Sequence, residues 1–333
     1  MTQSRLENRV SQYCLLFLTA VALTMSLIYT RPVLLPFVFS IFFFAVASPA
    51  VHWLQRQARF PRWLAVATMF MAVAFVCTML TAMILFSLED FVRGADVYKV
   101  RIVEMSRSLL ERAAGLGYEL DQSTLLDKVR SLPVFSFARQ VTGGLTTLFG
   151  NVFLVLIFVL FLLAGEQADK NSHPVLEEVL KKISGYLLVK FLLSAATGFG
   201  VALILLTFDI ELAVLIGLLT FLLNFIPNVG SLIATLLPIP LILLEYGVGG
   251  RLFGVVILCM ALEVLIGNVL EPRLMGESMD LHPVTILVFL MFWGLVWGIA
   301  GMFLAVPITA VIKIVLSRFK PTRPVAELMA GRF

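Results

Sequence analysis

The chain has 333 residues, of which 60% are hydrophobic and only 14% are charged, and its mean hydropathy is +1.00. Soluble domains carry roughly 45–50% apolar and about 25% charged residues, so this composition excludes an ordinary water-soluble fold. The net charge of +4 is too small to indicate a nucleic-acid-binding protein. The composition therefore predicts an integral membrane protein.

Five apolar runs before Asp209 are long enough to cross a bilayer, since a spanning helix needs about 20 apolar residues. They are Tyr13–Tyr29, Pro32–Leu54, Trp63–Leu88, Leu145–Ala164 and Tyr186–Phe208. Between the third and fourth runs, residues 89–141 hold eight acidic and eight basic side chains, and apolar residues recur there at helical spacing. We expect amphipathic helices outside the bilayer, with a break near Gly115–Gly117. A shorter amphipathic piece, Glu166–Ser184, precedes the fifth run.

Beyond Asp209 the apolar runs have unusual lengths. Leu212–Phe225 and Ser231–Leu244 span about 21 Å each as helix, too little to cross a core of about 30 Å. The pair is interpreted as a re-entrant hairpin or one broken span. After a normal crossing at Leu252–Leu270, the run Val284–Leu316 would span about 50 Å. It can turn back on itself at Gly294, Gly298, Gly301 or Pro307.

The second half therefore contains one span followed by an interrupted apolar hairpin, twice in succession. This pattern points to a transport site in membrane proteins, although eight ordinary spans, two of them short, are the alternative. We predict an all-α polytopic membrane protein with about eight membrane segments. Two of these are interrupted or re-entrant hairpins in the C-terminal half. The predicted fold also includes an amphipathic helical region outside the membrane. The predicted domains are residues 1–88, 89–141 and 142–333.

Lysine and arginine in short loops predict the orientation, because cytoplasmic loops carry the excess of these residues. One side of the predicted topology collects Arg5, Arg9, Arg56, Arg59, Arg62, Lys170, Lys181, Lys182, Arg318, Lys320 and Arg323. The other side receives Arg31 and little else in short loops. Both termini are therefore expected in the cytoplasm, with residues 89–141 outside.

The break between the two arms of the first hairpin carries polar residues at membrane depth. Asn224, Asn228 and Ser231 surround Pro227 and Gly230. Proline removes an amide donor and glycine permits a sharp turn. Backbone groups without hydrogen-bond partners are tolerated inside a membrane only where they are buried in protein or line a water-filled cavity. These side chains are expected either to cap the hairpin tip or to bind a polar solute or ion.

A second polar constellation closes the following span. Asn268 and Glu271 are three residues apart on one helix face, Pro272 is expected to end the helix, and Arg273 can pair with a nearby carboxylate. Glu263 lies near mid-span, where a carboxylate must be protonated, paired or turned to a cavity. The alternatives are an interfacial ion pair at the helix end and a role in solute or proton handling.

In the fifth span, Lys190 stands in a stripe of residues spaced by four with Tyr186, Ser194 and Gly198. Ser194 and Gly198 favour close helix packing, while Lys190 either snorkels to the interface or acts as a functional cation. Scattered histidines and the absence of a Gly-rich phosphate loop from the sequence give no support to metal, triad or ATP chemistry. We therefore expect no enzyme, metal or cofactor.

Asn224-Phe-Ile-Pro-Asn-Val-Gly230 and Asn268-Val-Leu-Glu-Pro-Arg-Leu-Met-Gly276 resemble the two signatures of the autoinducer-2 exporter (AI-2E) family of bacterial permeases. Tyr186-Leu-Leu-Val-Lys190 and Phe292-Trp-Gly294 agree with this, and the resemblance is weakest across residues 89–141. The signature positions carried over are Asn224, Pro227, Gly230, Asn268, Glu271, Pro272 and Gly276. Glu263 is not one of them, so its importance rests on membrane physics alone.

The resemblance implies a multi-pass protein of the bacterial inner membrane, with residues 89–141 in the periplasm. It also implies a homo-oligomer, for which a pentamer is one possibility. Some members look like exporters of the quorum-sensing signal autoinducer-2, and others behave like sodium–proton antiporters. Membership does not fix the substrate.

We hypothesise an ATP-independent exporter of a small polar solute, foremost autoinducer-2, with its site between the two interrupted hairpins. Asn224, Asn228, Asn268 and Glu271 are expected to line one polar cavity near mid-membrane. The partners would be membrane lipid and the solute or a monovalent cation, with coupling to a proton or sodium gradient left open. The alternatives are cation–proton exchange through Glu263 or Glu271 and, from another class, a non-transporting membrane scaffold that uses residues 89–141.

Overall fold

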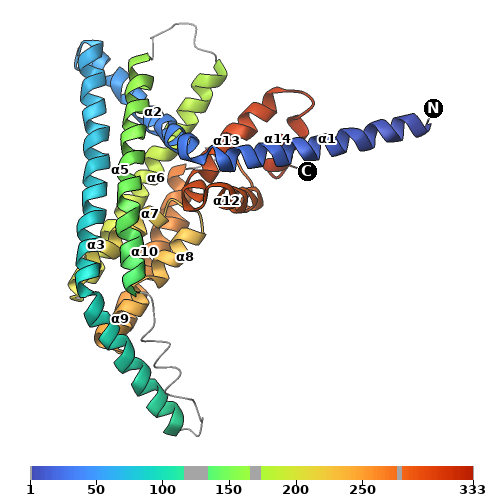
Figure 1. The fold of residues 1–333 in the computed structure, drawn as a ribbon. Coiled ribbons are helices and arrows are strands. Elements are labelled where there is room, and N and C mark those ends of the chain that lie inside the picture. The colour runs from blue at the N-terminus through green and yellow to red at the C-terminus, as the bar shows by residue number, and fades with distance from the viewer. Residues whose placement is uncertain (1, 116–133, 166–173, 276–279, 333) are drawn as a thin grey trace. The chain divides into compact units, whose positions relative to one another are not determined.

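A computed structural model describes residues 2–115, 134–165, 174–275 and 280–332 (Figure 1). Every regular element in these ranges is a helix, which confirms the all-α prediction. In chain order they are α1 (Thr2–Tyr29), α2 (Arg31–Gln57), α3 (Arg62–Gly115), α5 (Val134–Gly165), α6 (Pro174–Thr207), α7 (Ala213–Leu223), α8 (Val229–Leu236), α9 (Pro238–Tyr246), α10 (Gly250–Glu263), the π-helix η1 (Val264–Leu270), α11 (Glu271–Met275), α12 (Pro283–Trp297), α13 (Ile299–Arg318) and α14 (Arg323–Met329).

The helices have the length and surface of membrane-spanning segments. Among the described residues, six are long and apolar enough to cross a bilayer: Arg31–Gln57, Arg62–Met83, Glu178–Thr207, Val229–Tyr246, Gly250–Met275 and Ile299–Arg318. Large apolar side chains such as Phe199, Met291 and Leu295 are more than 70% exposed. Hydrocarbon rather than water suits such a surface. The chain is therefore a polytopic membrane protein.

The chain forms two compact units. The first comprises residues 1–70, 154–186 and 277–333, and the second comprises residues 71–153 and 187–276. Helices α3, α5 and α6 run from one unit into the other without interruption. The predicted domain boundaries at 88/89 and 141/142 fall inside α3 and α5, and the three-domain division stays a prediction.

Two predicted extramembrane pieces are continuations of longer helices. α3 passes Leu88 and is helical as far as Gly115, where the described range ends, and α6 is helical already at Pro174. The expected break near Gly115–Gly117 reaches into residues outside the described part and stays a prediction. The expectation of a separate amphipathic piece at Glu166–Ser184 is therefore corrected. From Pro174 onward, these residues form the first turns of α6. No proline follows Pro174 in this stretch, and a helix once started gains one hydrogen bond per added residue. Residues 116–133 and 166–173 lie outside the described part.

The core of the second unit lies among α6, α7, α9 and α10. It consists of Val201, Leu205, Ile210, Ala213, Ile216, Ile242, Val255 and Cys259. α6 and α7 approach so closely that a Cβ on Gly198 would lie 2.6 Å from the Gly217 carbonyl oxygen. This confirms the packing interpretation of Gly198, because only a small residue permits such an approach.

The first interrupted run is a hairpin whose two arms begin and end at the same end of α6. α7 ends at Leu223, the chain turns through Asn224–Asn228, and α8 packs back on α7 before α9 continues outward. At the far end of α9, the Tyr246 hydroxyl donates to the backbone oxygen of Asp209, 2.7 Å away. The 11 residues of α7 reach only about 17 Å, so this arm cannot cross a bilayer.

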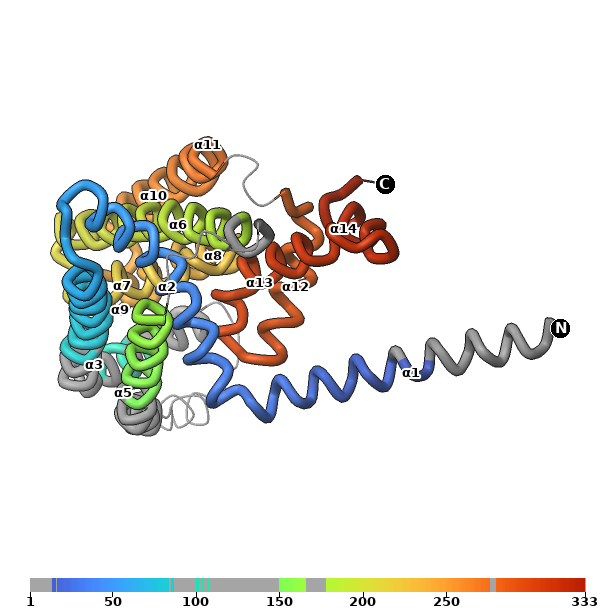
Figure 2. Tube along the Cα trace, turned by 90° about the horizontal axis from the view of Figure 1, so that it is seen from above, coloured from blue at the N-terminus to red at the C-terminus, as the bar shows by residue number. Residues whose placement is uncertain are grey.

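The second interrupted run is also a hairpin, formed by α12 and α13 in the first unit (Figure 2). It turns at Gly298, whose φ of +67° lies in the left-handed region that glycine adopts without strain. Asp280, just before α12, pairs with Lys313 near the end of α13 at 2.6 Å, so both arms again begin and end together. Both interrupted runs are therefore hairpins with a short first arm.

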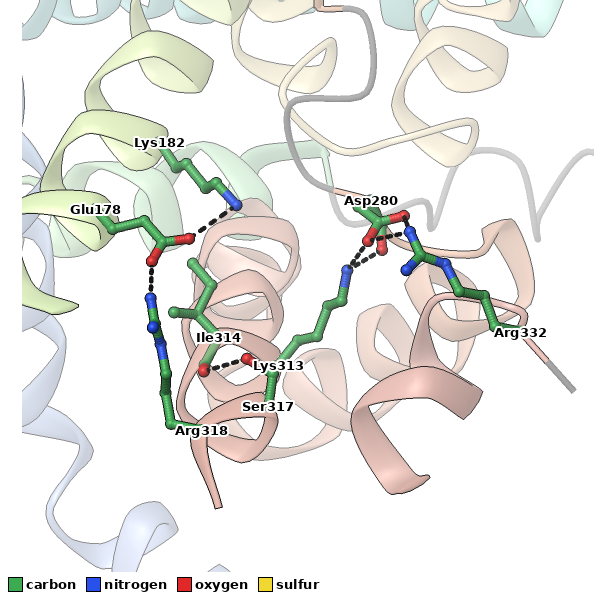
Figure 3. A network of polar contacts seen from close by, with 8 residues as sticks. All are labelled: Glu178, Lys182, Asp280, Lys313, Ile314, Ser317, Arg318 and Arg332. Carbon is green, nitrogen blue, oxygen red and sulfur yellow. Dashed lines mark hydrogen bonds and ion pairs between the residues drawn. The ribbon is translucent and has the colours of Figure 1, made fainter. Parts of the chain in front are cut away.

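Ion pairs hold the open end of the α12–α13 hairpin and the C-terminal helix α14 (Figure 3). Asp280 accepts hydrogen bonds from Lys313 and, at 3.0 Å, from Arg332, which follows α14 in the chain. The Glu178 carboxylate on α6 contacts Lys182 at 3.3 Å and also Arg318 at the end of α13. These contacts attach α14 and the start of α6 to the base of the hairpin.

The attachment of α14 is expected to weaken in acid. The hydrogen bond from Lys313 lowers the pKa of Asp280 below its usual value, with Arg332 adding to the effect. A lowered pKa stabilises the folded arrangement above the unfolded value of about 3.9, and this contribution is lost as the pH falls through the folded pKa. A spin label on L328C, in α14, should therefore become more mobile in acid. In a D280N background it should be mobile already at neutral pH, and equal mobility in the two proteins throughout would contradict the role of Asp280.

Candidate transport site

One face of α6 brings polar groups into the apolar interior of the second unit. Lys190, Ser194 and Thr197 follow one another at helical spacing, and all three are buried. Ser194 lies thirteen residues before the end of α6 at Thr207, or about 20 Å along the helix. The polar face therefore lies deep within the helix rather than at the water boundary.

The tip of the α7–α8 hairpin meets this face. The buried Asn224, just after α7, directs its side-chain nitrogen to the hydroxyls of Ser194 at 3.3 Å and Thr197 at 3.5 Å. The antiparallel packing of α7 on α6 places Asn224 there, because Gly217 lies against Gly198 one to two turns away. The re-entrant tip thus ends about halfway along α6.

A buried ion pair lies one turn beyond the hairpin tip. Lys190 Nζ is 2.6 Å from Glu271 Oε1, and the side chains are 3% and 23% exposed. Lys190 therefore does not snorkel to the interface: a buried ammonium is stabilised by a nearby carboxylate, and Glu271 supplies it. Among the described residues Glu271 pairs with Lys190 and not with Arg273, whose side chain is exposed. The interpretation of Glu271 and Arg273 as an interfacial ion pair was wrong.

Glu263 is the third charged residue of this region. It is only 9% exposed, and its Oε1 atom has no hydrogen-bond partner among the described residues. Its carboxyl interacts electrostatically with both Lys190 and Glu271. An ionised carboxylate without a partner is very costly in an apolar interior, so Glu263 is suited to carrying a proton.

The two glutamates stand at the two ends of a π-helical segment. In a regular α-helix they would be about 80° apart around the axis, but η1 has i→i+5 hydrogen bonds and therefore a wider turn. The helix continues through Pro272 to Met275, so the expectation that Pro272 ends it was wrong. Proline is tolerated inside a membrane helix where local π-helical turns, here those of η1, adjust the backbone hydrogen bonds.

The remaining predicted residues lie around this centre without a described contact to it. Asn228 is exposed and is the central residue of a γ-turn, with a φ of +59° and a ψ of −47°, because the Val229 amide donates to the Pro227 carbonyl. Its side chain does not cap α8, and its carbonyl accepts a hydrogen bond from Ser231 at 3.1 Å. Pro227 is partly exposed, Gly230 is buried within the hairpin, and Asn268 is exposed on η1. A single cavity lined by Asn224, Asn228, Asn268 and Glu271 stays a prediction.

The structure adds two threonines that the sequence did not single out. Thr197 shares the face of Lys190 and contacts Asn224. Thr220 is fully buried four residues before Asn224, and its hydroxyl has no partner among the described residues. Their spacing from Lys190 and Asn224, seven and four residues, could have indicated both, because such residues share a helix face.

Residues 16–320 match the family model described as AI-2E family transporter. The chain belongs to the AI-2E transporter family. An AI-2E relative of Escherichia coli K12, the AI-2 transport protein TqsA, is 27% identical over 91% of this chain and 90% of its own length. A candidate transport protein of Haemophilus influenzae is 31% identical over 89% of this chain and 90% of its own. The E. coli K12 candidate transport protein YhhT is 28% identical over 87% and 86%.

Membership of the AI-2E family supports a role in membrane transport. It gives no support to an enzymatic activity. The compared proteins align along most of their length, so the Lys190–Glu271 region and both hairpins lie within the matched residues. The substrate does not follow from the family alone, because related transporters differ in what they carry.

Proposed function

We propose that this protein is an ATP-independent transporter that exports a small polar solute, with autoinducer-2 as the first candidate. The observation that carries the proposal is the meeting of the re-entrant α7–α8 tip with the buried polar face of α6. Broken helices at mid-membrane are where transporters bind their substrates. A relative is an AI-2 transport protein, which favours that solute.

The chemistry of the site suits a small oxygen-rich molecule. Asn224 offers an amide, Ser194, Thr197 and Thr220 offer hydroxyls, and the turn at Asn224–Asn228 leaves backbone groups outside regular helix. Side-chain amides and hydroxyls both donate and accept hydrogen bonds, and backbone carbonyls accept them, without adding charge. A neutral polyol-like solute could exchange its water for these groups.

The expected location is the bacterial inner membrane with both termini in the cytoplasm and residues 89–141 in the periplasm. This orientation rests on the lysine and arginine distribution in the short loops. Export then means movement from the side of the termini to the side of residues 89–141. The homo-oligomer, too, stays a prediction.

Autoinducer-2 flux into proteoliposomes tests the proposal. Replacing Asn224 with alanine should lower the flux at least tenfold, while the inserted amount stays near that of the parent, because the two described side-chain contacts of Asn224 are long, at 3.3 and 3.5 Å. N151A is the control for loss of an asparagine side chain, since Asn151 is exposed on α5. It should transport normally. Parent protein that moves no more autoinducer-2 than empty liposomes would exclude this solute.

Cation–proton exchange is the second candidate, and the buried Glu263 carboxyl favours it. A sodium gradient across the same proteoliposomes should then drive proton movement, read by an enclosed pH-sensitive dye. Flux of neither autoinducer-2 nor cations would favour the non-transporting scaffold instead.

A further inference from the structure

Three ionisable side chains share one small region of the second unit. Lys190 supplies one positive charge, and Glu263 and Glu271 supply two carboxyls. If both carboxyls were ionised, one negative charge would be left uncompensated in a largely apolar interior. Such a charge is strongly disfavoured, and the usual escape is to bind a proton. The region is electrically balanced when it holds one proton.

The contacts indicate where that proton resides. Glu271 is paired with Lys190 at 2.6 Å, whereas Glu263 Oε1 is buried and has no partner among the described residues. Glu271 is also the more exposed of the two, at 23% against 9%. The paired, partly exposed carboxylate is the better place for the negative charge, and the enclosed Glu263 is the better place for the proton.

We propose that Glu263 carries one exchangeable proton and that Lys190 is a tethered cation which moves from Glu271 to Glu263 when that proton leaves. The O–H bond of Glu263 breaks and the proton passes to water, while the ammonium keeps its three hydrogens and pairs with the new carboxylate. Glu271 keeps its negative charge and becomes free to face water or an entering solute. This inference rests on the proposed transport function and names the coupling ion.

The backbone between the two carboxyls suits such a change of partner. The wide turns of η1 join Glu263 to Glu271, and π-helical turns recur at functional sites. Within η1, Gly267 has no heavy atom within 4 Å of the position a Cβ would take, so neighbouring side chains do not lock the segment there. A small change in the turns would alter which carboxyl faces Lys190.

In the described part of the chain, the remaining group that interacts with Glu263 does not supply a competing charge. Its electrostatic partners are Lys190 from α6, Glu271 from α11 and the buried thiol of Cys259 one turn earlier on α10. A thiol is neutral at ordinary pH. Within the described ranges, Lys190 is therefore the cation that can compensate Glu263 when it ionises.

Infrared spectroscopy of the full-length protein tests the inference without any transport measurement. A protonated carboxyl gives a carbonyl stretching band that a carboxylate lacks. The parent at neutral pH should show this band, and E263Q should lose it, whereas E327Q, which changes an exposed carboxylate on α14, should keep it. A band that is unchanged in E263Q would show that Glu263 is ionised and would overturn the proposal.

The variant E271Q decides whether Lys190 changes partner. With Glu271 neutralised, the ammonium should turn to Glu263 and ionise it, so the band should disappear although Glu263 is still present. Persistence of the band in folded E271Q would exclude the exchange. K190M gives a second measurement if E271Q does not fold. In K190M the carbonyl band should persist in alkaline buffer in which the parent protein has lost it. Loss of the band at the same pH as in the parent would overturn the proposal. Failure of autoinducer-2 flux changes none of these outcomes.

Discussion

Replacing Gly230 with alanine is expected to prevent the α7–α8 hairpin from closing. A Cβ at this position would overlap the backbone carbonyl of Leu223 at the end of α7, and it would also approach Ile226. Backbone atoms cannot move aside as the end of a flexible side chain can. Overpacking costs about 1–3 kcal/mol of stability and occasionally more. We therefore expect G230A to lower the free energy of unfolding by about 3 kcal/mol or more.

The measurement is the yield of monodisperse protein in mild detergent, together with its midpoint of thermal unfolding. G185A is the matched control, because Gly185 lies inside α6 with no heavy atom within 4 Å of a Cβ. Alanine in a helix interior is favoured over glycine by roughly 0.5–1 kcal/mol, so G185A should be neutral or stabilising. A G230A protein as stable as G185A would mean that the hairpin tip is not closed as described.

The double variant E263Q/E271Q should be far less stable than either single variant. In E271Q, Lys190 still has Glu263 as a partner, and in E263Q an amide replaces a neutral carboxyl of nearly the same shape. Only the double variant leaves the ammonium buried without a carboxylate. Removing one partner of a buried ion pair costs about 3–5 kcal/mol, and the free energy of unfolding should fall by about that amount.

Thermal unfolding of the four proteins in the same detergent measures this coupling. Adding K190M to the double variant should restore most of the lost stability, because it removes the unpaired charge. If E271Q alone were as unstable as the double variant, Glu263 would not serve as a second partner for Lys190. Equal and additive losses in the two single variants would also contradict it.

The two hairpins show which local features could be read from the sequence. The positions of their turns follow from Pro227, Gly230 and Gly298, because proline and glycine act on the backbone next to them. In both hairpins a residue with positive φ, Asn228 or Gly298, is followed by a glycine packed on a carbonyl of the first arm. The carbonyls are those of Leu223 for Gly230 and Trp293 for Gly301, and no sequence pattern identified these contacts.

Helix ends were less predictable where a breaker had a local remedy. Pro272 was expected to stop its helix, but the preceding π-helical turns allow the chain to continue to Met275. The start of α6 was missed for a related reason, since charge suggested an extramembrane piece while nothing in the backbone stopped the helix after Pro174. Polarity reports the surroundings of a helix and does not by itself end it.

The sequence by itself determined the membrane-protein class, the lengths of the apolar helices, the two interrupted runs and the kinds of polar residue inside them. These depend on composition and on neighbours in the chain. The tertiary structure decided which polar residues meet: Lys190 pairs with Glu271 across 81 positions, and Asn224 contacts Ser194 across 30. It also left Asn228, Asn268 and Arg273 exposed. The reason is that such pairs depend on which faces of packed helices touch, and the close Gly198–Gly217 approach and the wide turns of η1 set those faces.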